Sequence, residues 1–153
     1  MSGSETEKNY VLGQAYAVRA YSYFMLAQMF SRTYKGHESE PCVPLYTEPT
    51  DIATEGKGRA TVEEVYQQIT SDLDKAITML GNSGKRKHIS HINEAVASGI
   101  KARVALVMED WQTALDAANA AISKSGCSIG TGTAVTGGMN DATANNVMWA
   151  AEF

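Results

Sequence analysis

The sequence predicts an all-α fold of antiparallel helical hairpins, with one long proline-containing loop and one glycine-rich loop. Apolar residues recur at helical spacing in four separate stretches. A tight turn at Glu109-Asp110 separates the last two stretches, so these two should pack side by side. All the prolines fall at positions 41, 44 and 49, outside the four stretches. The chain length of 153 residues suits one domain or a part of one.

The first predicted helix, residues 10–30, is the element around which the others should be organised. Its sequence, YVLGQAYAVRAYSYFMLAQMF, is crowded with aromatics, and Arg19 is its only charged residue. A helix that is apolar on nearly every side needs other helices around it, so we expect it at the centre of the domain. Arg19 should extend to solvent or pair with a loop carbonyl or a carboxylate. The polar residues 1–9 are expected to be a disordered tail or a sequence added by cloning.

Residues 33–59 are predicted to form a long loop. All the prolines and Gly36, Gly56 and Gly58 lie in it. Residues that precede proline avoid the helical region, so VPLYTEP at 43–49 should be extended. A loop of this length in a compact domain is often functional or partly disordered.

The second predicted helix begins after Thr61 and ends near Gly81. Thr61 and Glu64 have the spacing of a capping box, in which each side chain binds the backbone N–H of the other residue. Apolar residues from Val62 to Leu80 form one stripe, which leaves Asp72 among the carboxylates of the polar face. Gly81 is expected to be a left-handed residue that ends the helix.

The third and fourth helices are predicted at residues 92–108 and 111–124. Ser90 and Asp110 are the expected N-cap residues. Gly99 lies inside the third helix at a cost of about 1 kcal/mol, which suggests close approach by a neighbour. We expect Trp111, just after the tight turn, to pack within the hairpin. The pair AxxGIKARVALVMEDWQTALDAANAAI resembles a tetratricopeptide-type hairpin, with small residues at the crossing.

The C-terminal part, residues 126–153, is predicted to be a glycine-rich loop followed by an apolar segment. Residues 126–138 are rich in Gly, Thr and Ser and have no helical period. The last residues, NNVMWAAEF, could form a strand. The sequence thus divides into the tail 1–9, a tetratricopeptide-like helical domain at 10–125 that contains the long loop 33–59, and the segment 126–153.

Composition excludes several classes of protein. The net charge of −4 argues against a nucleic-acid-binding protein, which needs a basic surface. The one basic run, Lys85-Arg86-Lys87-His88, is interpreted as a solvated loop. No apolar run is long enough for a membrane span. Cys42 and Cys127 can form a disulfide or remain free, and free thiols are favoured.

Four segments in order resemble consecutive pieces of the SusD/RagB family. They are AVRAYSYFMLAQMF, VPLYTEPTD followed by GRATVEEVYQQITSDLDKAI, AVASGIKARVALVMEDWQTALDAANAAI, and GGMNDATANNVMWAAEF. The resemblance covers the chain from about Tyr10 to Phe153. It implies a tetratricopeptide-like scaffold with a loop-rich part that carries much of the ligand surface.

The same resemblance implies a function without catalysis. Family members are outer-membrane lipoproteins that bind oligosaccharides or polysaccharides at the cell surface and cover a SusC-like TonB-dependent transporter. They are several times longer than this chain, and no signal peptide or lipidated cysteine is recognisable here. We therefore expect the chain to be a scaffold segment of such a nutrient-binding protein.

The long loop supplies the candidate ligand-binding residues. Sugar sites combine aromatic ring faces with carboxylates, amides and hydroxyls, and loops on rigid scaffolds commonly carry them. On this basis Tyr34, His37, Glu38 and Tyr46 are the candidates. The alternative is a surface loop whose aromatic side chains only pack against the helices.

Other functions have little support in the sequence. His88 and His91 have helical spacing, but no nearby Cys, Asp or Glu completes a metal site. No constellation of catalytic residues and no cofactor-binding motif is recognisable. Two further expectations remain open: a tetratricopeptide-like scaffold for protein–protein interaction without its own glycan site, and self-association of the chain through an exposed apolar patch.

Overall fold

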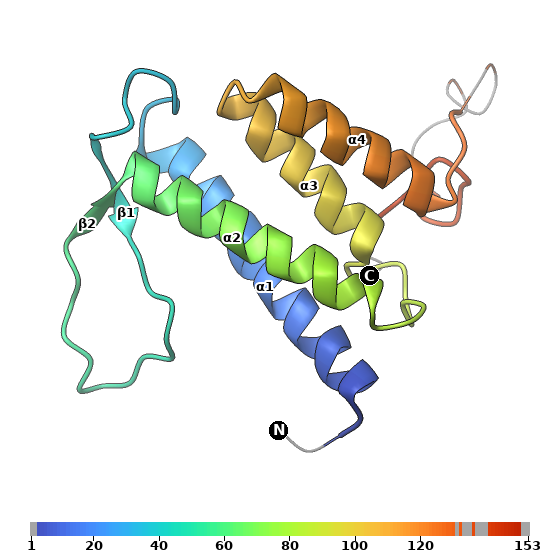
Figure 1. The fold of residues 1–153 in the computed structure, drawn as a ribbon, viewed down its shortest axis with the longest axis horizontal. Coiled ribbons are helices and arrows are strands. Elements are labelled where there is room, and N and C mark those ends of the chain that lie inside the picture. The colour runs from blue at the N-terminus through green and yellow to red at the C-terminus, as the bar shows by residue number, and fades with distance from the viewer. Residues whose placement is uncertain (1–2, 131, 133–135, 137–140, 151–153) are drawn as a thin grey trace.

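The computed structural model describes residues 3–130, 132, 136 and 141–150, and shows helices in two antiparallel pairs beside a small pair of strands (Figure 1). The first helix packs against the second, and the third against the fourth. The predicted fold class of helical hairpins is therefore confirmed. In chain order the elements are α1 (Glu5–Phe30), β1 (Pro41–Pro44), β2 (Arg59–Thr61), α2 (Val62–Gly81), α3 (Glu94–Val107) and α4 (Trp111–Ser125).

Helix α1 begins at Glu5, earlier than the predicted residue 10. A capping box explains the early start. The Ser4 hydroxyl accepts a hydrogen bond from the Glu7 N–H, and the Glu7 carboxylate accepts one from the Ser4 N–H at 2.9 Å. The hydrogen bonds from Ser4 also lower the pKa of Glu7. The expectation of a disordered tail at 1–9 is thus wrong for residues 5–9, and residues 1 and 2 lie outside the described residues.

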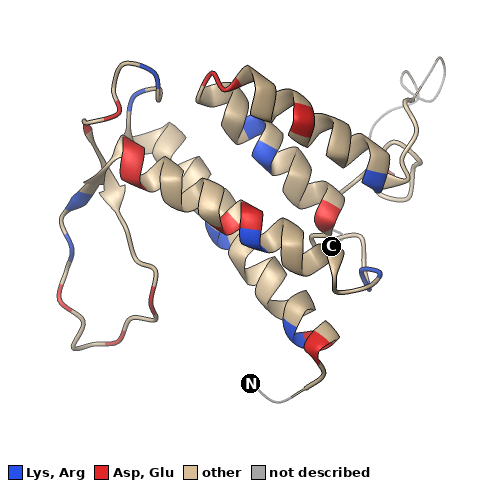
Figure 2. Cartoon of the chain, in the orientation of Figure 1, with Lys and Arg blue, Asp and Glu red and all other residues tan. Residues whose placement is uncertain are grey.

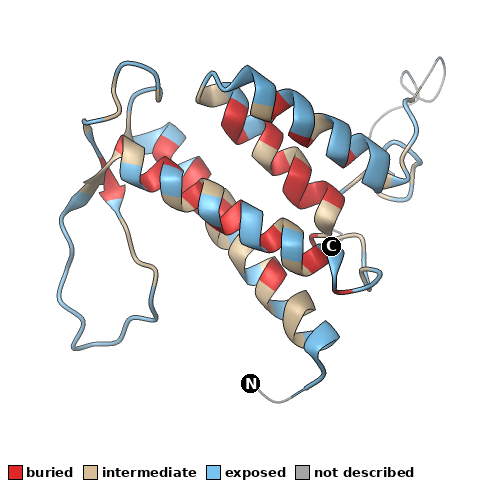
Figure 3. Cartoon of the chain, in the orientation of Figure 1, coloured by how far each residue is buried: buried red, intermediate tan, exposed pale blue. Residues whose placement is uncertain are grey.

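Other helices do not enclose α1 within the described chain, contrary to expectation. One face of the helix is buried, and α2 is the element that mainly contacts it. The other face is open, and Phe30 there is 59% exposed. Figure 3 shows α1 as alternating buried and exposed segments. The exposed α1 face is defined here as Val11, Val18, Met25, Leu26, Met29 and Phe30.

The core lies between α1 and α2 and extends to α3. Phe24 from α1 and Tyr66, Ile69 and Leu73 from α2 are almost completely buried. The Tyr66 ring meets the Phe24 ring edge-on, with 6.3 Å between centroids, and the Tyr34 ring at 5.1 Å. Edge-to-face pairs of this kind add to the stability that burial alone supplies.

The long loop contains β1 and β2, an antiparallel pair that the sequence analysis did not predict. The pair is short because Pro41 and Pro44 have no N–H to donate to a ladder. Two hydrogen bonds continue it toward α2, from the Val62 N–H to the Glu40 carbonyl and from the Glu63 N–H to the Glu38 carbonyl, each 2.9 Å. Of the segment 43–49 that was expected to be extended, residues 43 and 44 lie in β1.

The capping box of α2 is confirmed. The Thr61 hydroxyl accepts from the Glu64 N–H at 3.2 Å, and the Glu64 carboxylate accepts from the Thr61 N–H at 2.8 Å. The prediction for Gly81 is wrong, because this residue still belongs to the helix. The left-handed glycine of the connection is Gly84, at φ +77°.

Helix α3 begins later than predicted, with Asn93 as its N-cap in place of Ser90. The Asn93 side chain accepts from the Val96 N–H at 3.0 Å, whereas Ser90 is hydrogen-bonded to His88. Asp110 caps α4 as predicted and accepts from the Thr113 N–H at 3.1 Å. Trp111 is 64% exposed, so its expected packing role in the hairpin is wrong within the described chain.

The segment after α4 returns to the connection between α2 and α3. The Trp149 Nε1–H donates to the Ser90 carbonyl at 2.8 Å, and its ring lies edge-on to Tyr21 with centroids 5.8 Å apart. Arg86 donates to the Met148 carbonyl at 2.6 Å. Residues 145–150 contain no strand, while residues 151–153 and most of 131–140 lie outside the described residues. Cys42 and Cys127 are free thiols, as favoured.

Gly13 marks the closest approach of α1 to the end of α2. A Cβ atom at Gly13 would lie 2.7 Å from Leu80 Cγ and 3.2 Å from Met79 Cβ. We therefore expect Gly13→Ala to destabilise the chain by about 1–3 kcal/mol, since overpacking outweighs the gain in helix propensity. At Gly99 the nearest atom is the flexible end of Met148, 3.4 Å away, so Gly99→Ala should be neutral or stabilising. Urea unfolding of both variants checks this, and equal effects would contradict it.

Candidate functional site

An open groove of about 690 Å³ lies between the C-terminal half of α1 and the strand β1. Its walls are mainly apolar and aromatic side chains, with two arginines at the margins. The helical spacing of α1 brings Ser22, Leu26 and Phe30 to one wall, and β1 provides the other. The lining residues are Arg19, Ser22, Tyr23, Leu26, Phe30, Cys42, Val43, Pro44, Tyr46 and Arg59.

Arg19, at the margin of the groove, connects α2 to the long loop. Its guanidinium donates two hydrogen bonds to the Asp72 carboxylate, at 2.7 and 2.8 Å, and a third to the Thr47 carbonyl at 2.9 Å. The expectation that Arg19 pairs with a carboxylate or a loop carbonyl is confirmed for both partners. Asp72, expected on the polar face of α2, is instead 0% exposed. The hydrogen bonds with Asp72 raise the pKa of Arg19.

Tyr23 holds the same loop at the preceding residue, Tyr46. Its hydroxyl accepts a hydrogen bond from the Tyr46 N–H at 2.6 Å and donates one to the Tyr46 carbonyl at 3.1 Å. Together with Arg19, this contact fixes residues 46 and 47 against α1. The arrangement explains why this part of the long loop, which lies between β1 and β2 and has no regular structure of its own, still has a defined position.

Arg59 closes the other end of the groove. Its guanidinium donates to the carbonyls of Cys42, Pro41 (2.8 Å) and Phe30 (3.2 Å). The last contact links the end of α1 to the strand pair. Because both arginines are already hydrogen-bonded to the protein, the groove offers a ligand mainly apolar and aromatic surface.

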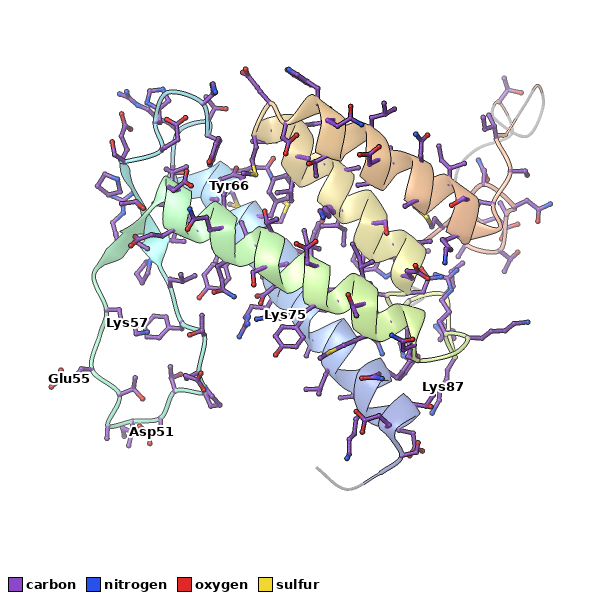
Figure 4. All side chains as sticks on the ribbon, viewed as in Figure 1. Asp51, Glu55, Lys57, Tyr66, Lys75 and Lys87 are labelled. Carbon is purple, nitrogen blue, oxygen red and sulfur yellow. The ribbon has the colours of Figure 1, made fainter. Side chains whose placement is uncertain are left out.

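Tyr46 is the one candidate ligand-binding residue that lines this groove. Its hydroxyl accepts from the Lys57 N–H at 2.9 Å, and the Lys57 ammonium lies 5.4 Å from the ring centroid. Figure 4 shows Lys57 on the extended loop between the strands. Tyr46 is thus fixed by Tyr23 at its backbone and by Lys57 at its hydroxyl, and its side chain stays partly exposed.

Tyr34 lies elsewhere, in the turn that precedes β1. Its hydroxyl donates to the Glu63 carboxylate, and its ring packs on Tyr66. Burial, followed by the hydrogen bond to Glu63, raises the pKa of Tyr34 to about 12. These contacts are those of a packing residue that keeps only part of its ring accessible.

His37 and Glu38 lie in the same turn as Tyr34. His37 Nδ1 is 2.9 Å from the Glu40 carboxylate, which also faces Arg32 at 3.5 Å. The hydrogen bond with His37 lowers the pKa of Glu40, and backbone N–H groups lower that of Glu38. The structure therefore brings Tyr34, His37 and Glu38 together and places Tyr46 apart from them.

Sequence reasoning missed most of the groove. Leu26 and Phe30 were interpreted only as part of a helix to be enclosed, and Arg59 as an ordinary loop residue. The available signal was the charge of Arg19 inside an apolar helix, which indicated a partner from outside that helix. Nothing in the sequence indicated that β1 would lie opposite α1.

Two other kinds of site can be assessed among the described residues. No group of three or more His, Cys, Asp or Glu side chains in this part of the chain is arranged to hold a metal ion. Within the same residues, no helix combines the length and apolar character needed to cross a bilayer.

The sequence matches one protein family over residues 1–106. The matching model is SusD-like and is described as starch-binding associating with outer membrane. Among curated proteins, none matches this chain significantly.

Solved structures show the same fold. A SusD-like carbohydrate binding protein from Bacteroides vulgatus superposes with a TM-score of 0.88 over 97% of this chain, at 29% identity, and 31% of that chain is covered. A SusD superfamily protein from Bacteroides thetaiotaomicron gives a TM-score of 0.73 over 85% of this chain, at 29% identity and 28% coverage of that chain. NanU of B. fragilis gives 0.65 over 85%, at 27% identity and 26% coverage. The chain thus spans less than a third of the length of these structures.

Proposed function

The chain belongs to the SusD-like family, and from this premise we propose that it is a segment of a cell-surface glycan-binding protein that works with a SusC-like TonB-dependent transporter. SusD-like binding proteins are non-catalytic, and the family associates with the outer membrane. The glycan is an oligosaccharide or a polysaccharide. The extensive superposition on a carbohydrate binding protein supports a role in this binding.

The observation that carries the proposal in this chain is the position of Tyr46. Its ring lies at the margin of an apolar groove, and its backbone and hydroxyl are both fixed by hydrogen bonds. A rigid aromatic ring of this kind suits the C–H face of a pyranose, because little conformational freedom is lost on binding. Ser22, which also lines the groove, supplies a hydroxyl for the sugar edge. We include Tyr34, His37 and Glu38 as a second, separate contact region for a longer glycan.

Glycan-array binding tests the proposal. The 153-residue chain is compared with Tyr46→Ala, and with Trp111→Ala as the control that removes an exposed aromatic ring on α4, outside both contact regions. We expect binding of a neutral oligosaccharide such as maltohexaose that weakens about tenfold or more in Tyr46→Ala, the loss expected for one stacked aromatic contact. Absence of oligosaccharide binding by the folded chain, or equal binding by Tyr46→Ala, would contradict the assignment.

A second candidate function is a tetratricopeptide-like scaffold that binds another protein and has no glycan site of its own. The exposed α1 face favours it, because an apolar surface of this kind is typical of protein contacts. The two functions differ in the residues that matter. Substitutions of Val18 and Met29, which belong to the exposed α1 face but do not line the groove, would weaken a protein contact, whereas Tyr46→Ala would weaken glycan binding.

We also expect the chain to self-associate at high concentration through the exposed α1 face. Val18 and Met29 on this face are exposed, so burial in a dimer would remove apolar area from water. In sedimentation experiments, Val18→Glu with Met29→Glu should weaken self-association about tenfold or more. The control Ile122→Glu changes an equally exposed apolar residue on α4. A wild-type chain that remains monomeric at high concentration would contradict this prediction.

A further inference from the structure

A second groove, of about 600 Å³, lies between the first turns of α1 and the connection from α2 to α3. The connection from α2 to α3 lies near the start of α1, whereas β1 lies at the other end of this helix (Figure 1). The lining of the second groove combines basic side chains with one aromatic ring. The lining residues are Thr6, Glu7, Lys8, Tyr10, Val11, Ser83, Lys85 and Lys87.

The groove is positively charged although the chain carries a net charge of −4. Lys8, Lys85 and Lys87 contribute three ammonium groups, and Glu7 is the only acidic residue of the lining. The Glu7 carboxylate is occupied by the N–H and hydroxyl of Ser4, each 2.9 Å away. Lys8 also faces Glu5, at 3.7 Å on the exposed side. Figure 2 shows the basic residues of the connection close to the start of α1.

The basic run that the sequence analysis interpreted as a solvated loop is divided by the structure. Lys85 and Lys87 line the groove, whereas Arg86 between them donates hydrogen bonds to the carbonyls of Met148 and Ile89. Arg86 therefore holds the connection, and its two neighbours remain available to a ligand.

Tyr10 fixes the connection to α1. Its hydroxyl accepts a hydrogen bond from the Lys87 N–H at 3.2 Å and is also hydrogen-bonded to His91 Nδ1. The Lys87 ammonium lies 5.7 Å from the Tyr10 ring centroid. Figure 4 shows Lys87 beside the first turns of α1. The ammonium groups are thus presented by a backbone that is already anchored, which lowers the entropy that a ligand would have to remove.

We propose that this groove binds the carboxylate of an acidic saccharide, an inference that rests on the proposed glycan-binding function. Lys85 and Lys87 donate charge-assisted hydrogen bonds to the carboxylate, and Lys8 adds attraction from the other wall. Tyr10 and Val11 supply the apolar surface against which the C–H groups of the sugar ring pack. A uronic acid combines these two features in one residue.

Isothermal titration calorimetry, which measures the affinity of the 153-residue chain for trigalacturonate, tests the inference. The double variant Lys85→Ala/Lys87→Ala should weaken binding about tenfold or more, because it removes two charge-assisted contacts. Binding by the intact chain should also weaken as salt increases. The matched control, Lys101→Ala/Lys124→Ala, removes the same charge from the surface of α3 and α4 and should leave the affinity unchanged.

Two results would overturn the inference. One is trigalacturonate binding that is absent or that the Lys85/Lys87 variant does not change. The other is equal affinity for tri-aspartate, since that would show charge attraction without recognition of a sugar. Neutral maltohexaose separates this outcome from failure of the proposed function: its binding depends on Tyr46 and should be unchanged in the Lys85/Lys87 variant. Failure at the basic groove with intact maltohexaose binding would leave the proposed function standing.

Discussion

Replacement of Arg19 by methionine is expected to lower the free energy of unfolding by about 3 kcal/mol. The substitution keeps much of the apolar length of the side chain but leaves the Asp72 carboxylate, which is 0% exposed, without its charged partner. An uncompensated buried charge costs about 3–5 kcal/mol, and we take the lower end because Arg19 itself is partly exposed and the Gln68 side chain still donates to the Asp72 carboxylate at 2.8 Å. Urea unfolding monitored by circular dichroism measures the effect.

The chain contains a matched control for this prediction. Lys101 and Asp74 also form a salt bridge, with 2.6 Å between Nζ and Oδ1, but the Asp74 side chain is 54% exposed. Lys101→Met should therefore change stability by no more than about 1 kcal/mol. In the double variant Arg19→Met/Asp72→Leu, removal of both charges should restore much of the loss. Equal effects of Arg19→Met and Lys101→Met would show that burial of Asp72 contributes nothing.

The second large effect is expected at Tyr66. Its ring is almost completely buried between Phe24 and Tyr34, so Tyr66→Ala should destabilise the chain by about 3–5 kcal/mol through loss of contacts and formation of a cavity. That is a large part of the total stability of an ordinary domain. Tyr66→Phe keeps the ring and should cost less than about 1.5 kcal/mol. Thermal and urea unfolding of the two variants separate the ring from the hydroxyl, and similar losses in both would contradict this account.

The same residue predicts a loss of stability at alkaline pH. Burial raises the pKa of Tyr66 to about 12, above its usual value of about 10. Below pH 10 both the folded and unfolded chains keep the proton, and the stabilisation is complete. Between about pH 10 and 12 the unfolded chain releases the proton first, so stability falls as the pH rises. Tyr66→Phe should reduce this fall in urea midpoints measured from pH 8 to pH 11.5, while Tyr34, whose pKa is also about 12, retains its own contribution.

Tyr66 also connects stability to the candidate ligand residues. Its ring supports Tyr34, and Tyr34 is hydrogen-bonded to Glu63 at the start of α2. Loss of the Tyr66 ring should therefore loosen the turn that carries His37 and Glu38, while Tyr46 is held independently by Tyr23. The two proposed glycan contact regions thus depend on different parts of the core.

Local patterns predicted the parts of the fold that depend on local interactions. The capping box at Thr61 and Glu64, the N-cap at Asp110 and the tight turn before α4 involve residues a few positions apart, so the sequence alone contains them. The same local logic was available for α1, where Ser4 and Glu7 have the identical spacing, but the polar composition of residues 1–9 favoured a disordered tail. For α3, both Ser90 and Asn93 have side chains suited to an N-cap, and the sequence alone does not distinguish them; the structure has Asn93 in this role.

The candidate site was less predictable, because its parts come together only through tertiary contacts. Tyr46 and Tyr34 lie in one loop of the sequence, yet contacts with α1 and α2 respectively place them in separate regions. Helical periodicity places polar residues such as Asp72 on the exposed face of α2. Asp72 is nevertheless buried, because the two hydrogen bonds from Arg19 compensate the cost of burying its carboxylate.

The sequence by itself determined the helical pairs, most of their ends and the family to which the chain belongs, because these follow from side-chain spacing and from order along the chain. Only the tertiary structure decided which face of α1 is covered, that β1 lies against that helix to form a groove, and that Lys85 and Lys87 face Tyr10 while Arg86 turns away. The physical reason is that these arrangements depend on packing and hydrogen bonds between residues far apart in sequence. Arg19 and Asp72 show this directly, since they are separated by 53 positions and joined by two hydrogen bonds.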